Sequence, residues 1–211
     1  MKLNSKIQRS GILFVISSPS GAGKTTLARK LIEIDSNIEL SISVTTRHPR
    51  KSEKRIIDYI FVDEKSFGKM IKEDKFLEHA EVFGNKYGTL KQPIINKLEK
   101  GKDILFDIDW QGTQELKEKE SKHLVSVFVL PPSTIELEKR LLNRAQDSKE
   151  VVKKRMSEAT SEMTHWAEYD YVIINDDLKK TLQKLIAILT AERLKRKRQT
   201  GLNSFVRKVI F

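Results

Sequence analysis

The sequence predicts an α/β fold in three layers, with a mostly parallel central sheet covered by helices on both faces. Apolar runs of strand length, such as residues 12–16 and 124–130, alternate along the chain with segments of helical periodicity. Buried strands of a parallel sheet have this continuous apolar character because helices cover both of their faces. The chain has 211 residues, enough for one such domain with inserted subdomains.

The first strand, at residues 12–16, leads through a loop of small residues into a helical pattern. Alternating residues at 40–44 indicate the second strand. Further strands are expected at residues 58–62, 76–83, 103–109, 124–130 and 171–174, with a turn at residues 84–85 leading into residues 86–89. Helices are expected from residue 63 or 66 to 71, from 93 to 98, from about 133 to 142, near Trp166, and from 178 to about 197.

The segment at residues 45–90 interrupts the alternation of strands and helices. It contains short strands and charged loops in place of long apolar runs. We therefore expect it to form its own lobe, inserted into a core made of residues 1–44 and 91–211.

Residues 17–26, with the sequence SSPSGAGKTT, join the first strand to the first helix and have the composition of a phosphate-binding P-loop. Gly21 and Gly23 let the backbone turn its N–H groups toward an anion, which the helix N-terminus also favours. Lys24 can reach the β- and γ-phosphates of a nucleotide, and the Thr25 hydroxyl can ligate Mg²⁺. Ser18 stands where the full pattern G-x-x-x-x-G-K-[ST] has glycine. An ordinary Ser/Gly turn is the alternative, but it does not account for Gly-Lys-Thr at a strand-to-helix junction.

The formal net charge of +11 indicates polyanionic partners, either nucleic acid or phosphate-rich small molecules. Part of this charge lies at residues 193–198, RLKRKR, at the end of a helical pattern. Such a run is usually a solvated helix end, and no aromatic RNA-binding signature accompanies it, so nucleic acid is not expected as a partner.

The sequence contains no cysteine, and its N-terminal apolar run is too short for a membrane span or a signal peptide. We expect a cytoplasmic protein that does not bind membranes. The four histidines show no metal-ligand spacing and no nucleophile–base pattern, so all four are expected to be structural.

The expected lobe carries side chains that suit a second phosphate group. Arg47 and Arg50 lie around Pro49, and guanidinium groups match phosphate oxygens bidentately. The hydroxyls of Tyr59 and Tyr87 can donate hydrogen bonds to the same oxygens. The lobe therefore suits a second phosphorylated substrate.

Glu78 is a carboxylate within the otherwise apolar run FLEHA at residues 76–80. Guanine presents two neighbouring donors, N1–H and the exocyclic amino group, and a carboxylate accepts from both. Adenine has no such pair on its Watson–Crick edge. For Glu78 alone, a position on the solvent face of a strand is the alternative, and the combination with the two arginines and two tyrosines weakens that alternative.

These motifs and their order resemble those of guanylate kinases, which transfer the γ-phosphoryl group of ATP to GMP. The resemblance covers nearly the whole chain. It rests on PSGAGK (19–24), SVTTR with Arg50 (43–50), DYIFV (58–62), FLE (76–78), FGNKYGT (83–89), LFDIDWQG (105–112) and INDD (174–177). It implies a P-loop fold with an inserted lobe that binds the nucleoside monophosphate, and a lid at about residues 143–157.

The resemblance also implies roles for individual residues. Mg²⁺ is the expected cofactor, and GMP or dGMP the expected acceptor. Thr25 would hold the metal, with Asp107 or Asp109 assisting directly or through water, although Asp107 could instead serve the guanine side. The ATP-binding residues would be Ser18, Pro19, Ser20, Gly21, Ala22, Gly23, Lys24, Thr25, Thr26 and Asn175, the last near the adenine. The GMP phosphate would be held by Arg47, Arg50, Tyr59 and Tyr87, and guanine by Ser43, Glu78, Thr89 and Asp107. The catalytic cations would be Lys24, Arg47, Arg144 and Arg155, with Arg140 as a helper.

The sequence departs from the family pattern in three places. Ser52 and Ile56 stand where the family usually has glycines, and His79 stands where it has a tryptophan. In the lid, Asn143-Arg144-Ala145 replaces Gly-Arg-Gly, which keeps the arginine but stiffens the hinge. None of these changes removes a charge that the chemistry needs.

Three other functions are alternatives to this one. The first is an interaction module that keeps the guanylate kinase fold without catalysis, but such modules typically lack a working P-loop and sit in longer chains. The second is a P-loop kinase for another acceptor, such as AMP, CMP or shikimate, which a substrate panel would separate. The third is a nucleic-acid binder that uses residues 193–198. A homo-oligomer is compatible with the sequence, which leaves the oligomeric state open.

Overall fold

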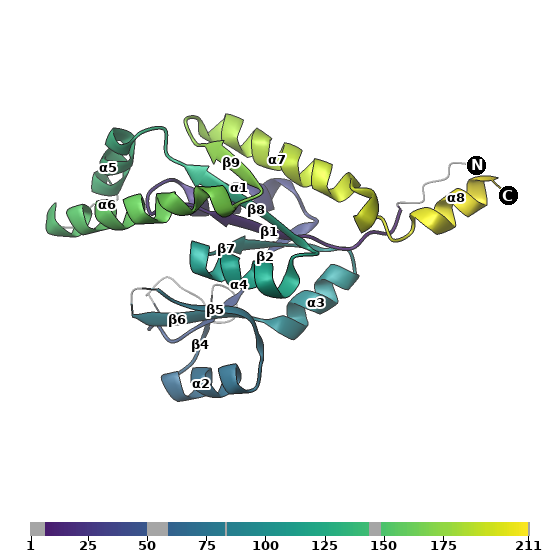
Figure 1. Ribbon diagram of the computed structural model, residues 1–211, viewed down its shortest axis with the longest axis horizontal. Helices are drawn as coiled ribbons and strands as arrows, with labels where there is room; N and C mark the ends of the chain where they lie inside the picture. The colour runs from purple at the N-terminus through teal and green to yellow at the C-terminus, as the bar shows by residue number, and fades with distance from the viewer. Residues whose placement is uncertain (1–6, 50–58, 83, 144–148, 211) are drawn as a thin grey trace.

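The structure is a computed structural model that describes residues 7–49, 59–82, 84–143 and 149–210, without the side chains of residues 143 and 149–152. It has a core and a lobe, with the lobe at the bottom of the view in Figure 1. Within these residues, no helix combines the length and the apolar character that crossing a bilayer requires.

The core is built on a five-stranded sheet with the strand order β2-β7-β1-β8-β9, in which all pairs are parallel. This confirms the predicted fold class. The strands are β1 (Leu13–Ser17), β2 (Ile38–Leu40), β7 (Asp103–Asp107), β8 (Leu124–Leu130) and β9 (Tyr171–Ile174).

Helices cover both faces of this sheet because its strands are apolar on both sides. The Phe14 and Ile16 side chains on one face pack against α1 (Lys24–Ile34) and α7 (Leu178–Leu194). On the other face, Leu13 and Val15 pack against α3 (Lys91–Glu99) and α4 (Trp110–Glu120). Successive residues of β1 thus serve two separate cores.

Helix α4 was not among the elements expected from the sequence. Its sequence, WQGTQELKEKE, is largely polar, and it buries only Gly112, Thr113 and Leu116. Asp109 caps it by accepting a hydrogen bond from the Gly112 N–H at 3.0 Å. The helix therefore owes its place to its cap and to three buried positions, and hydrophobic periodicity does not reveal it.

The lobe contains a four-stranded sheet with the order β4-β3-β6-β5. Helix α2 (Glu64–Lys72) covers one face of it, where Val44, Phe67 and Phe76 are buried together. Asp63 caps α2 by accepting the Ser66 N–H at 2.7 Å, one of the two caps expected. The strands are β3 (Ser43–Thr45), β4 (Tyr59–Phe61), β5 (Phe76–Val82) and β6 (Asn85–Leu90).

The single strand predicted at residues 40–44 is wrong. Leu40 ends β2 in the core, and Ser43 begins β3 in the lobe. Between them, the Ser41 N–H still bonds to the Leu105 carbonyl of the core at 2.8 Å. The alternation of side chains continues across this crossing, so the pattern could not reveal it. We propose that the lobe begins at Ser43.

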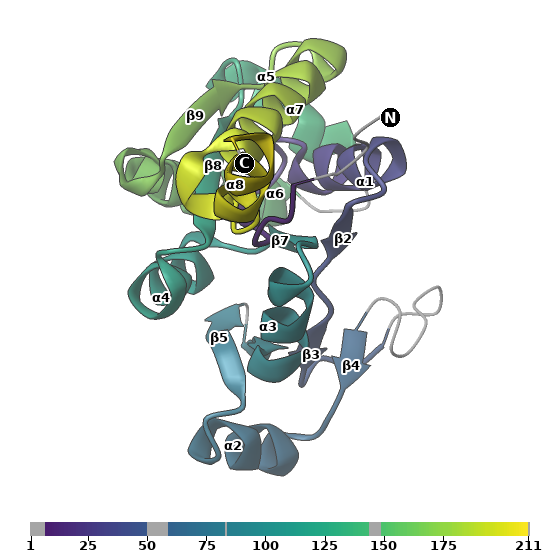
Figure 2. The same ribbon diagram turned by 90° about the vertical axis from the view of Figure 1, so that its right-hand side faces the viewer.

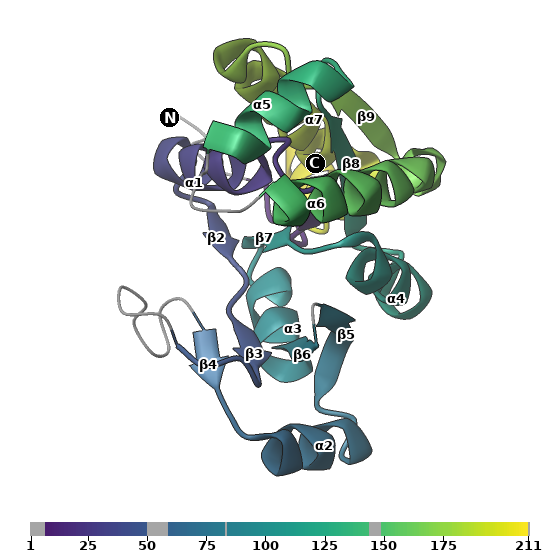
Figure 3. The same ribbon diagram turned by 90° about the vertical axis from the view of Figure 1, so that its left-hand side faces the viewer.

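Helices α5 (Thr134–Asn143) and α6 (Lys149–Met163) lie side by side at one end of the core (Figure 3). Leu137 and Leu141 of α5 are buried against Ala159 of α6. The helix expected near Trp166 begins earlier than predicted, since α6 starts at Lys149 and Trp166 lies in the following 3₁₀ helix η1 (Thr164–Glu168).

The C-terminal region also differs from the expectation of one helix to about residue 197. Helix α7 ends at Leu194, and a 3₁₀ turn η2 (Arg196–Arg198) and helix α8 (Leu202–Ile210) follow. Figure 2 looks along α8, which projects from the core. Arg198 is only 2% exposed, and its Nη2 lies 3.4 Å from Glu192 Oε2. The basic stretch is therefore not simply a solvated helix end.

Asp103 is the centre of an ionic network that joins distant parts of the core. Its side chain is fully buried and accepts hydrogen bonds from Arg9 Nη1 and Arg193 Nε, both at 2.7 Å, and from the Ile12 N–H at 2.9 Å. Arg193 also bonds to Asp35 at 2.5 Å. This network holds the N-terminal segment, β7 and α7 together.

Replacing Asp103 should strongly destabilise the fold. We expect Asp103→Ala to lower the free energy of unfolding by about 3–5 kcal/mol, because it leaves Arg9 without its buried counter-charge and Arg193 with Asp35 alone. Urea unfolding followed by circular dichroism measures this change. The control Lys197→Ala, at an exposed position, should change stability by no more than about 0.5 kcal/mol. Equal stability of the two variants would contradict the role given to Asp103.

Candidate functional site

The loop between β1 and α1 has the backbone geometry of an anion-binding loop. Gly21 and Gly23 have φ values of 92° and 100°, in the left-handed region that glycine adopts without strain. Helix α1 begins at Lys24, so its first N–H groups belong to this loop. A β-carbon on Gly23 would lie 2.7 Å from Asn175 Nδ2, which adds a steric reason for glycine.

Asn175 supports the loop from beneath. It is 4% exposed, and its Nδ2 donates to the Ala22 carbonyl at 2.7 Å. Arg140 of α5 in turn donates to the Asn175 carbonyl at 3.3 Å. Asn175 was expected near the adenine, and its contacts within the protein are those of a residue that fixes the shape of the P-loop.

Lys24 and Thr25 both contact Asp107 at the end of β7. Lys24 Nζ lies 3.0 Å from Asp107 Oδ1 and also donates to the Ile108 carbonyl at 2.9 Å. The Thr25 hydroxyl donates to Asp107 Oδ2 at 3.0 Å. The Asp109 carboxylate, by contrast, caps α4. Asp107 is therefore the carboxylate that lies beside the P-loop.

These oxygen ligands fit Mg²⁺ of the kind that accompanies nucleotides. A hydroxyl and a carboxylate adjoin the P-loop, and Mg²⁺ is usually held by one or two such groups together with substrate phosphates and water. The described residues contain no group of three His, Cys, Asp or Glu side chains that could hold a metal ion without a substrate.

Four of the residues predicted for the lobe form one row across its sheet. Ser43 of β3 pairs with Tyr59 of β4 and with Thr89 of β6, and Thr89 pairs with Glu78 of β5. Tyr87, two residues before Thr89, lies on the same face. Because α2 covers the opposite face, this face is available to line a cleft.

A β-bulge directs Glu78 into that cleft. The pairing of β5 with β6 shifts between Phe76 and Glu78, so that Leu77 is an extra residue. Phe76 therefore packs under α2, Leu77 packs into the core, and Glu78 points to the other side of the sheet. The bulge lets three successive residues serve the lobe, the core and the site.

Glu78 is buried but keeps a hydrogen bond. It is 3% exposed, and its Oε1 accepts the Thr89 hydroxyl at 2.6 Å. Burial raises the pKa of Glu78 to about 7, the negative charges of Glu115 and Asp109 also raise it, and the Thr89 bond lowers it. A β-carbon at Gly112 would lie 2.9 Å from Glu78 Oε2, so a larger residue there would require this carboxylate to shift.

Arg47 lies with two tyrosines at the edge of the same face. Its guanidinium carbon lies 5.3 Å from the centroid of the Tyr59 ring, and the Tyr59 and Tyr87 rings are 6.1 Å apart. The Arg47 N–H bonds to Thr45 Oγ1 at 3.1 Å, which fixes the backbone before the side chain projects. Arg50, Ser52 and Ile56 fall outside the described residues.

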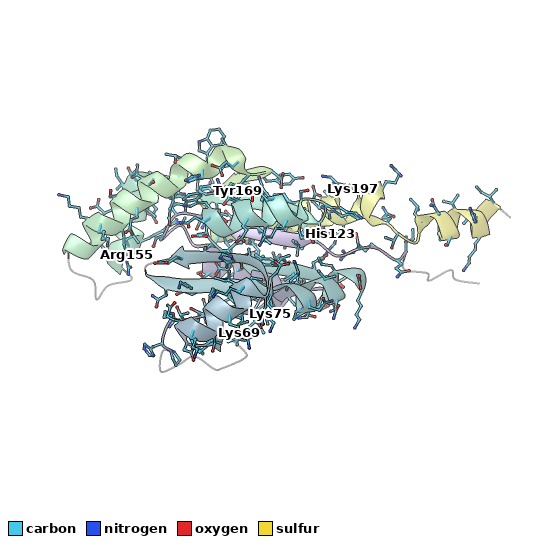
Figure 4. All side chains as sticks on the ribbon, turned by 60° about the horizontal axis from the view of Figure 1, so that its bottom comes forward. Lys69, Lys75, His123, Arg155, Tyr169 and Lys197 are labelled. Carbon is cyan, nitrogen blue, oxygen red and sulfur yellow. The ribbon has the colours of Figure 1, made fainter. Side chains whose placement is uncertain are left out.

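The lobe face and the P-loop line a common cleft of about 250 Å³. An adjoining hollow of about 140 Å³ reaches Thr25 and α1. The lining residues of the cleft include Lys24, Asp107 and Asp109 from the core and Ser43, Tyr59, Glu78 and Tyr87 from the lobe. A separate hollow of about 410 Å³, lined partly by His123, contains none of the predicted site residues. His123 lies far from Arg155 in Figure 4.

Helix α6 contributes Arg155, one of the arginines predicted for the lid, whereas Arg144 and Ala145 fall outside the described residues. It also contributes a residue that the sequence did not predict. Glu162 Oε2 accepts the backbone N–H of Ser20, in the P-loop, at 3.0 Å. A glutamate in a polar helix carries no sequence signal of such a contact. Gly112 was also missed as a site residue, although it belongs to the quoted motif at residues 105–112.

The pKa of Glu78 can be tested through its neighbours. We expect Thr89→Val to raise the pKa of Glu78, since it removes a bond to the ionised form, and Glu115→Gln to lower it, since it removes a like charge. Carbon-13 NMR of labelled glutamate carboxyls, titrated from pH 5 to pH 9, measures both shifts. A Glu78 resonance that titrates near pH 4 in the unmodified protein would contradict the burial of this carboxylate.

Comparisons with known proteins were consistent with this geometry. The sequence profile described as guanylate kinase matches residues 10–192. The chain is 54% identical to a guanylate kinase of Nitrobacter winogradskyi over 96% of this chain and 93% of the relative. It is 56% identical to that of Paramagnetospirillum magneticum over 95% and 94%. The crystal structure of guanylate kinase from Anaplasma phagocytophilum superposes with a TM-score of 0.78 at 39% identity, covering 94% of this chain and 95% of that one.

Proposed function

This chain belongs to the guanylate kinase family, and on that basis we propose that it transfers the γ-phosphoryl group of ATP to GMP or dGMP, giving ADP and GDP or dGDP. One observation carries this proposal beyond family membership. The buried Glu78 carboxylate and the row of polar side chains on the lobe face the same cleft as Lys24 of the P-loop. The enzyme is a nucleoside monophosphate kinase, and the cytoplasm, where its nucleotide substrates are found, is its proposed compartment.

The lobe is the proposed GMP site. Glu78 would accept hydrogen bonds from N1–H and the exocyclic amino group of guanine, while Thr89 and Ser43 lie beside it in the same row. Arg47, Tyr59 and Tyr87 would hold the phosphate at the edge of this face, with Arg50 from the segment that follows.

The P-loop is the proposed ATP site, with Lys24 on the β- and γ-phosphates and α1 directing its N-terminus at them. Thr25 and Asp107 would hold Mg²⁺ directly or through water, and the Lys24–Asp107 contact would then give way to phosphate contacts. Mg²⁺, when bound, neutralises part of the charge of the ATP phosphates.

The reaction needs charge neutralisation more than proton transfer. The attacking phosphate oxygen of GMP is already anionic at pH 7, so no strong general base is required. The work lies in bringing two polyanions together and in stabilising charge as the phosphoryl group moves. Lys24, Arg47 and the lid arginines Arg144 and Arg155 are the cations proposed to do this. Closure of the lobe and lid would exclude water, which otherwise competes as the acceptor.

Two observations bear on the alternative functions. The left-handed glycines and Lys24 keep the anion-binding elements of a P-loop, which argues against a module without catalysis. Arg193 and Arg198 are committed to buried carboxylates, which removes two cations from any nucleic-acid surface at residues 193–198.

A substrate panel tests the proposed function. ADP release from ATP and Mg²⁺ should be fast with GMP and dGMP and negligible with AMP, CMP and UMP. Lys24→Ala supplies the inactive control. Fast turnover with another acceptor would keep the P-loop assignment and overturn the role of Glu78. A folded protein that binds GMP without turnover with any acceptor would instead support the interaction module.

Replacing Glu78 should affect the two substrates unequally. We expect Glu78→Gln to raise the KM for GMP by roughly ten- to hundredfold, because an amide offers one acceptor oxygen where the carboxylate offers two. The KM for ATP should change by less than about twofold, since the P-loop is intact. Steady-state kinetics with each substrate varied in turn makes the comparison, and an equal rise in both KM values would count against a guanine-reading role.

Comparison with Glu78→Gln isolates the part of the pH dependence of GMP binding that is due to Glu78. Because the pKa of Glu78 is raised to about 7, acidification below that value protonates the carboxyl that must accept from guanine. The affinity for GMP should then fall by up to about tenfold per pH unit below pH 7. Calorimetric titrations at pH 6, 7 and 8 should show a steeper loss for the unmodified protein than for Glu78→Gln. Protonation of the GMP phosphate is common to both proteins and cancels in the comparison.

A further inference from the structure

Helices α5 and α6 both contact the P-loop. Glu162 of α6 accepts the Ser20 N–H at 3.0 Å. At the next residue, a β-carbon on Gly21 would lie 3.0 Å from the side chains of both Leu137 and Leu141 of α5. The two helices therefore meet the loop at two consecutive residues.

Glu162 interacts electrostatically with Lys24 and Asp109, which both line the candidate cleft. Burial raises the pKa of Glu162, while the Ser20 N–H and the charge of Lys24 lower it, and Asp109 and Glu158 raise it. Burying an ionised carboxylate near the negative charge of Asp109 costs free energy, unless a hydrogen bond or an opposite charge offsets it. The hydrogen bond from the Ser20 N–H supplies such an offset, and an apolar side chain could not accept it.

The position of Glu162 on α6 relates it to Arg155. The two residues are seven apart, or about two helical turns, so they project from the same face of the helix. Ala159 lies between them and is buried against Leu137 and Leu141 of α5. Fixing α6 at Glu162 and Ala159 therefore fixes the direction in which Arg155 projects. Figure 4 labels Arg155 on this helix, at the lid end of the molecule.

We propose that Glu162 is a positioning residue, which ties α6 to the P-loop and thereby sets the place of Arg155 over the ATP phosphates. The inference rests on the proposed function, because it assigns Glu162 an effect on phosphoryl transfer through Arg155. The P-loop backbone and Arg155 would then move together. A shift of the loop on binding ATP is passed to α6 through one hydrogen bond.

The first experiment compares Glu162→Ala, Glu162→Gln and the control Glu158→Ala, which lies one turn away on α6 and pairs only weakly with Lys154 at 3.9 Å. Glu162→Ala should lower kcat with ATP and GMP roughly tenfold, since a displaced catalytic cation costs rate. Glu162→Gln keeps an acceptor oxygen and should stay within about threefold of the unmodified enzyme. Glu158→Ala should match the unmodified enzyme, and thermal melting confirms that all variants are folded.

A double-mutant cycle shows whether Glu162 acts through Arg155. Arg155→Ala alone should lower kcat, and adding Glu162→Ala to it should lower kcat by less than about twofold further, because residues that act as one unit are not additive. Fully additive losses would overturn the proposal. So would an unchanged kcat in Glu162→Ala, or a tighter binding of ATP in that variant, which would mean that the carboxylate competes with phosphate.

Failure of this inference can be told apart from failure of the proposed function. If the unmodified enzyme turns over an acceptor other than GMP, the proposed function is overturned, and the same variants are measured with that acceptor. The loss in Glu162→Ala, its rescue in Glu162→Gln and the non-additivity with Arg155→Ala should persist there. Their absence would overturn the role of Glu162 whatever the acceptor is.

Discussion

The parallel pairing of β1 with β7 determines where the chemistry of this protein is located. In this register Ile16, near the end of β1, lies opposite Asp107, the last residue of β7. The carboxyl ends of parallel strands meet at one edge of a sheet, so the loop that follows β1 opens beside Asp107. The contacts of Lys24 and Thr25 with that carboxylate follow from the register, and the sheet sets the place of the P-loop before any ligand is bound.

The lobe buries the Glu78 carboxylate and still leaves it accessible to a ligand in the cleft. Its sheet has one apolar face packed on α2 and one polar face in the cleft, and the bulge at Leu77 brings Glu78 to the second. Burial alone disfavours the ionised form, and a ligand that donates two hydrogen bonds would restore it. The free energy of binding would thus depend on the ligand having donors where guanine has them.

Most of the site could be predicted from the types of residue in the sequence. Gly-Lys-Thr after an apolar strand indicated the P-loop, and the arginines, tyrosines and Glu78 indicated a second anionic substrate. The remaining features depend on strand pairing, which the sequence does not reveal. The row Tyr59–Ser43–Thr89–Glu78 depends on the register of the lobe strands. The crossing of the chain from core to lobe at Ser41 depends on which sheet each strand joins. Polar helix α4 and the Glu162 contact lack any periodic signal, because few side chains define them.

The network around Asp103 and Glu192 has a consequence for how the limits of this protein are drawn. The family profile matches residues 10–192, and Arg193 and Arg198, just beyond that span, pair with Asp103 and Glu192. Cutting the chain after residue 192 would leave Asp103 with Arg9 as its cation and would remove Lys195 and Arg198 from Glu192. The ionic network of the core therefore extends to Arg198, six residues past the end of the profile match.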